Sequence, residues 1–112
     1  MEEQEKYIAL AQLTIQLQQK PLDAALLLQR AKVYLSLGDK AKALDDLDAA
    51  ISADATRAEA FMLRGQLRFE LHDKNAAFED LQRAMQLDPD ILNNVSGEYK
   101  TPQAPKAFVI PK

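Results

Sequence analysis

Residues 21–54 read PLDAALLLQRAKVYLSLGDKAKALDDLDAAISAD, and residues 55–88 read ATRAEAFMLRGQLRFELHDKNAAFEDLQRAMQLD. When the chain is shifted along itself by 34 residues, identical residues coincide at many positions. These include Ala24 with Ala58, Arg30 with Arg64, Leu37 with Leu71, Asp39-Lys40 with Asp73-Lys74, Asp46-Leu47 with Asp80-Leu81, and Asp54 with Asp88. A fixed period of this size predicts a stack of small units, none of which can bury its own apolar face alone.

The composition predicts an all-α protein and excludes several functions. At 112 residues the chain is one domain, and it is rich in helix-favouring residues. The net charge of -3 argues against nucleic acid, which needs clustered cations. No apolar run reaches the length of a membrane span, and the acidic start Met1–Glu5 is unlike a secretory signal. The lack of cysteine fits a reducing compartment, so we expect a cytoplasmic protein.

Apolar spacing predicts five helices, over residues 4–19, 23–37, 39–52, 58–71 and 74–87. Asp23 and Asp39 are suited to cap helix starts, and Gly38 to end a helix. The leading helix belongs to the repeat, because Leu13 lies one period before Leu47. We therefore divide the chain into residues 1–20, the second helix of a partial unit; residues 21–92, two full units with a short closing segment; and residues 93–112, an irregular tail.

The two units resemble the tetratricopeptide repeat family. The first unit carries the family's apolar and small positions as Leu27, Ala31, Tyr34, Ala43, Leu47 and Ala50, with Ala55 in place of the closing proline. The second has Phe61, Gly65, Ala77, Leu81, Ala84 and Pro89, with Arg68 in place of the aromatic residue. The resemblance implies antiparallel helix-turn-helix repeats stacked as a short right-handed α-solenoid, with an extended C-terminal tail. The small residues would then lie where the two helices of a unit approach closest.

Arg30 and Arg64 replace an apolar residue that is commoner at their position, and Asp46 and Asp80 recur with them once per unit. We expect an Arg30–Asp46 pair and an Arg64–Asp80 pair, each joining the two helices of a unit. The alternative is four solvated charges. In either case the role is structural.

The sequence offers no set of residues suited to catalysis, a cofactor or a metal. His72 is the sole histidine, and it falls in a predicted turn. Asp45, Asp46 and Asp48 are close in sequence, but helical spacing turns Asp46 away from the other two, and no calcium-loop pattern surrounds them. We expect neither an enzyme nor a cofactor.

The resemblance implies a protein or peptide partner, bound in a concave groove lined by the first helix of each unit. The implied residues are Leu28, Gln29, Lys32, Leu35 and Ser36 in the first unit, and Glu59, Met62, Leu63, Gln66, Phe69 and Glu70 in the second. This surface suits an apolar peptide or helix, as in an adaptor or a co-chaperone-like module. Lys32 and Leu63 stand where members that clamp acidic chaperone tails carry Asn, so that activity is not implied. The alternative is that Leu28, Leu35, Met62 and Phe69 are core residues.

Two other functions stay open from the sequence. One is self-association through the uncapped ends of the stack, because repeat arrays need polar caps. The other is an accessory domain of a larger protein. In the tail, the apolar run Ala107–Ile110 is a liability if uncovered, so it could pack on the repeats of its own chain or of a second copy. A disordered terminus is the alternative.

Overall fold

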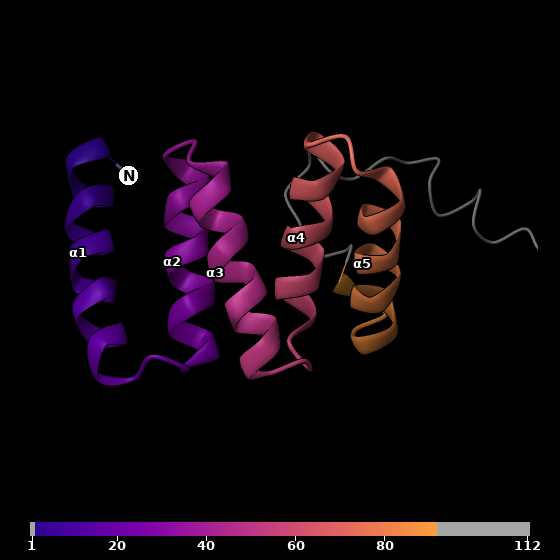
Figure 1. Ribbon diagram of the computed structural model, residues 1–112, viewed down its shortest axis with the longest axis horizontal. Coiled ribbons are helices and arrows are strands. Elements are labelled where there is room, and N and C mark those ends of the chain that lie inside the picture. The colour runs from indigo at the N-terminus through magenta and orange to yellow at the C-terminus, as the bar shows by residue number, and fades with distance from the viewer. Residues whose placement is uncertain (1, 92–112) are drawn as a thin grey trace, which may run out of the picture.

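The computed structural model describes residues 2–91 and shows a row of antiparallel helices (Figure 1). The helices are α1 (Glu3–Gln19), α2 (Ala24–Ser36), α3 (Lys40–Ala53), α4 (Ala58–Glu70) and α5 (Lys74–Leu87). Each begins and ends within three residues of the bounds expected from the sequence. The all-α fold of stacked helical repeats is confirmed for the described part of the chain.

The helix ends follow from local chemistry. Asp23, Asp39 and Asp73 cap α2, α3 and α5, each accepting a hydrogen bond from the backbone N–H three residues ahead. The turn between α2 and α3 needs a left-handed residue, and Gly38 supplies it with φ 82°. His72 occupies the same place between α4 and α5, with φ 67°. The lone histidine is thus a turn residue in a conformation that side chains disfavour.

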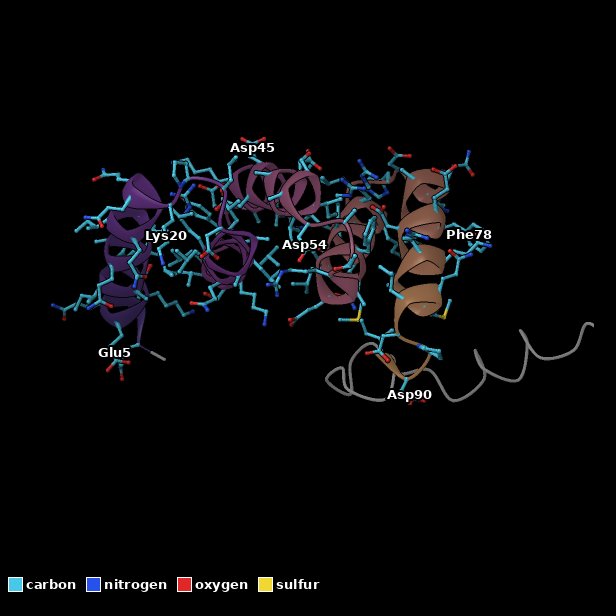
Figure 2. The ribbon with its side chains drawn as sticks, turned by 90° about the horizontal axis from the view of Figure 1, so that it is seen from below. Glu5, Lys20, Asp45, Asp54, Phe78 and Asp90 are labelled. Atoms are coloured by element: carbon cyan, nitrogen blue, oxygen red, sulfur yellow. The ribbon has the colours of Figure 1, made fainter. Side chains whose placement is uncertain are left out.

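The helices pack in sequence order. The contacts within the repeat units, α2 with α3 and α4 with α5, are the most extensive, while α1 packs on α2 and α3 on α4. Seen along the helices in Figure 2, Asp45 projects from the outer side of α3, away from α2 and α4. The first helices of the two units therefore share one face of the stack, and α3 lies on the other.

Small residues allow the helices of each unit to approach closely, as the repeat pattern predicts. In the first unit Ala31, Ala43 and Ala50 are fully buried. In the second unit, a Cβ atom on Gly65 would lie 2.9 Å from Leu81 Cγ and 3.2 Å from the Ala77 carbonyl oxygen. There is no room for a larger side chain at this crossing unless a neighbour moves.

The leading helix packs on the first full unit through Leu13 and Leu17, which are buried. Across residues 2–91, no helix is long and apolar enough to cross a membrane. The expectations for the tail, including the run Ala107–Ile110, lie outside the described residues.

Candidate ligand-binding groove

The expected groove residues lie at spacings of three and four along α2 and α4. Such spacing places side chains on one side of a helix. On α2 the series is Leu28, Lys32 and Leu35; on α4 it is Glu59, Met62, Gln66 and Phe69. We refer to the surface shared by these two series as the groove.

A cavity of about 630 Å³ opens where the N-terminal halves of α2 and α4 meet. Its apolar lining comes from Leu28, Met62 and Ile91. Leu28 and Met62 are only 6% and 7% exposed, and each also belongs to a hydrophobic core cluster. These two residues therefore support the fold and form the floor of the cavity at once.

The remaining expected groove residues differ in exposure. Leu35 and Leu63 are half-buried and pack against the core of the first unit. Gln66 is half-buried, whereas Gln29 is exposed and Phe69 is 58% exposed. Ser36 is exposed at the end of α2, where its hydroxyl donates a hydrogen bond to the Val33 carbonyl oxygen at 2.7 Å. Among the apolar residues, Phe69 is thus the one most available to a partner.

Two ion pairs connect the units along this face. Lys32 Nζ lies 2.6 Å from Glu59 Oε2, joining α2 to α4 across the groove. Lys40 Nζ lies 3.2 Å from Glu70 Oε1, joining the start of α3 to the end of α4. Because all four side chains are more than 40% exposed, each pair contributes little to stability. Their consequence for binding is that Lys32, the groove lysine on α2, already has a carboxylate partner.

The rim of the cavity includes residues that sequence reasoning did not assign to the site: Asp54, Thr56 and Arg57 from the α3–α4 connection, and Asp88 after α5. The signal available was the repeat itself, because Asp54 and Asp88 are equivalent positions of the two units. With Glu59, the rim holds three carboxylates and one guanidinium.

Asp54 is held in its ionised form by its own loop. Thr56 donates two hydrogen bonds to Asp54 Oδ1, from its hydroxyl at 2.6 Å and from its backbone N–H at 3.0 Å. These bonds, chiefly the one from the hydroxyl, lower the pKa of Asp54 below its ordinary value. Arg57 Nε lies 3.4 Å from Asp54 Oδ2 without forming a hydrogen bond, so this attraction is mainly Coulombic.

The expected Arg–Asp pairs are confirmed, and they lie away from the groove. Arg30 forms two 2.8 Å hydrogen bonds with Asp46, and Arg64 forms two of 2.9 Å with Asp80. Hydrogen bonding to the buried carboxylate raises the pKa of each arginine. Their function is to join the two helices of a unit.

These arginines also reach the preceding unit. Arg30 donates to the Thr14 hydroxyl at 3.2 Å, and Arg64 donates to Asp48 Oδ1 at 2.9 Å. In the second unit Arg68, which replaces the usual aromatic residue, adds a further bond to Asp80 at 2.9 Å. One carboxylate therefore holds two guanidinium groups there.

Within residues 2–91, no group of three or more His, Cys, Asp or Glu side chains is arranged to hold a metal ion. The cavity combines an apolar floor with hydrogen-bonding groups at its rim.

The profile of the family described as "Tetratricopeptide repeat" matches residues 24–57 and 58–91. The chain belongs to the tetratricopeptide repeat family. The two matched ranges coincide with α2–α3 and α4–α5, so each tetratricopeptide repeat is one of the helix pairs described above.

Solved structures share this fold. The crystal structure of MamA has a TM-score of 0.70 and 28% identity over 75% of this chain. The present chain spans about half (49%) of the length of MamA. The first TPR of Spaghetti (RPAP3) bound to the HSP90 peptide SRMEEVD has a TM-score of 0.73 and 27% identity, covering 77% of this chain and 68% of that one. The second TPR of Spaghetti with the same peptide gives 0.71 and 28%, covering 74% and 77%. The search among curated proteins found no match.

Proposed function

We propose that this chain is a protein-interaction module that binds a peptide or helix of a partner along the groove of α2 and α4, as an adaptor does. Tetratricopeptide repeats are generally protein-binding and not enzymatic, and two similar structures hold a bound peptide. The observation that carries the proposal is the cavity between Leu28 and Met62, where the two repeats meet. We keep the cytoplasm as the proposed compartment, since the chain has no cysteine.

The lining indicates the chemistry of the partner. The floor is apolar, and the rim carries Asp54, Glu59 and Asp88 against one Arg57. Complementary charge across an interface favours the right partner, and like charge disfavours the wrong one. We therefore propose an apolar segment with neutral or basic flanks as the ligand.

This proposal differs from the ligand of the Spaghetti structures. The peptide SRMEEVD carries two glutamates and an aspartate against one arginine. Here Lys32 is engaged by Glu59 at 2.6 Å, and no groove residue beyond Lys32 is cationic among those on α2 and α4 named above. Lys32 and Arg57 offset two of the three rim carboxylates, so the edge keeps a net negative charge and we expect an acidic peptide to bind poorly.

The proposal is tested by selecting ligands for the full chain from a random peptide library and measuring their affinity by calorimetry. We expect apolar sequences with neutral or basic flanks, and binding of SRMEEVD at least about tenfold weaker. Selected peptides that are predominantly acidic would contradict the proposed chemistry. A library that yields no ligand would contradict peptide binding.

Two phenylalanines provide a matched pair of variants. Phe69, in the groove, is 58% exposed, and Phe78, on the far side of α5, is 60% exposed (Figure 2). We expect Phe69→Ala to weaken binding of a selected peptide about fivefold or more, since exposed aromatics are frequent binding anchors. Phe78→Ala should leave the affinity unchanged. Equal effects of the two changes would show that the peptide does not bind in the groove.

Replacing Leu28 or Met62 would be less informative, because truncating such buried residues costs about 2–5 kcal/mol of stability.

A further inference from the structure

The outer side of α1 is an uncharged surface on which two isoleucines are exposed. We define the α1 face as Gln4, Ile8, Ala11, Gln12, Ile15 and Gln19, all of them exposed. Ile8 is 50% and Ile15 is 58% exposed, while the opposite side of the same helix buries Leu13 and Leu17 against the first repeat. A helix with apolar residues on both sides is normally buried on both sides.

The repeat supplies an internal control for this surface. At the positions of Ile8, Ala11 and Ile15, α3 has Lys42, Asp45 and Ala49, and α5 has Ala76, Glu79 and Arg83. Helices α3 and α5 therefore each place a charge at two of the three positions where α1 has only apolar residues. No charged residue occurs between Lys6 and Lys20, and Lys6 turns toward α2, where it donates to the Ser36 carbonyl oxygen at 3.1 Å. Depletion of charge in an exposed apolar patch is typical of an interface.

The charges at the two ends of α1 indicate what covers it. The first turn is acidic, with Glu3 and Glu5, and the cation Lys20 follows the last turn. None of the ion pairs within residues 2–91 uses these side chains. An antiparallel copy of α1 brings the acidic end of each helix to the lysine of the other. It also places the positive end of each helix dipole beside the negative end of the other, which is an attractive arrangement. A parallel copy would bring the acidic turns together.

We propose that the α1 face pairs with the α1 face of a second copy of this chain, in an antiparallel arrangement about a two-fold axis. In the register that places Ile8 of one copy on Ile15 of the other, Ala11 lies opposite Gln12, Gln4 opposite Gln19, and Glu3 opposite Lys20. The small Ala11 next to the axis permits close approach of the helices. The contact is self-complementary, as a two-fold interface requires. It leaves the groove of α2 and α4 free, so it does not depend on the proposed function.

The association is measured by sedimentation equilibrium of the full chain up to about 1 mM, because one helix-on-helix contact is at the small, weak end of specific interfaces. We expect a concentration-dependent dimer. Ile15→Glu should weaken it at least about tenfold by bringing a charge into an apolar contact, with the helical circular dichroism unchanged because the residue is exposed. Phe78→Glu is the matched control at the other end of the stack and should dimerise normally. A monomer at every concentration, or a dimer lost in Phe78→Glu and kept in Ile15→Glu, would overturn the proposal.

The orientation is tested by disulfide trapping, which the cysteine-free sequence makes clean. Gln12→Cys, next to the axis, should form a disulfide with its own copy. Gln4→Cys should not, because antiparallel copies separate the two positions by about 20 Å along the helix. An equal mixture of the Gln4→Cys and Gln19→Cys proteins should yield the mixed disulfide. Self-crosslinking of Gln4→Cys with no mixed product would mean parallel helices and would overturn the arrangement.

Discussion

Each repeat contains one buried aspartate that joins its two helices. Asp46 and Asp80 are 5% and 4% exposed, yet each accepts two hydrogen bonds from one arginine of the neighbouring helix. Such a pair stabilises the fold no more than well-packed apolar residues would, but removing one partner leaves a buried charge uncompensated. The pairs therefore fix how the two helices of a unit meet.

Asp80→Ala should destabilise the fold more than Asp46→Ala, because it deprives both Arg64 and Arg68 of their carboxylate. We expect a loss of about 3–5 kcal/mol in the free energy of unfolding, measured in urea. The exposed neighbour Asp45 is the control, and Asp45→Ala should change stability by less than about 0.5 kcal/mol. If Asp80→Ala proved as mild as Asp45→Ala, the pair would be a solvated contact.

Asp54 gives a pH-dependent prediction. Its pKa in the folded chain lies below its ordinary 3.8, so the ionised carboxylate adds stability at higher pH, and this contribution is lost as pH falls through the folded pKa. Thr56→Val removes the hydroxyl donor and should raise the pKa of Asp54 toward 3.8. Carbon-detected NMR titration of the side-chain carboxyl measures it, with Thr14→Val as the control. An Asp54 titration that is the same in all three proteins would exclude the hydroxyl as the cause.

At the scale of the helices, local signals predict most of what is observed. Aspartate caps and the glycine turn at Gly38 act within a few residues, so they are readable from the sequence. The 34-residue period then carries the bounds of one unit over to the next. The partners of Arg30 and Arg64 were predictable too, since the period repeats both members of each pair. The bond from Arg68 to Asp80 was not, because it depends on how far α4 lies from α5 after packing.

The close packing of α2 against α3 predicts that a larger side chain at their crossing destabilises the first repeat. Ala43 is fully buried where α3 meets α2, so Ala43→Leu should force the helices apart and cost about 1–3 kcal/mol. Ala41→Leu, two residues away on the exposed side of α3, should cost far less. Denaturant titration of both variants provides the measurement. Wild-type stability of Ala43→Leu would show that this crossing is not tight.

For the molecule as a whole, the sequence predicts the groove helices but not the shape of the site. Leu28 and Met62 follow from helical spacing on the two first helices. The rim does not, because Asp54 and Asp88 come from separate connections that meet only when the two repeats stack. The Lys32–Glu59 pair has the same origin, since its two residues lie in different units. Sequence reasoning therefore selected Leu28, Glu59 and Met62, which line the cavity, and missed the acidic character of its edge.

The central claim is that partners bind on the face shared by α2 and α4, and NMR chemical-shift mapping tests it most directly. Amide shifts of the isotope-labelled full chain would be followed while a library-selected peptide is added. The account predicts that the largest changes fall on groove residues such as Lys32, Glu59 and Gln66, with Asp45 and Glu79 on other exposed faces unaffected. Changes concentrated around Asp45 and Glu79, with the groove silent, would contradict it.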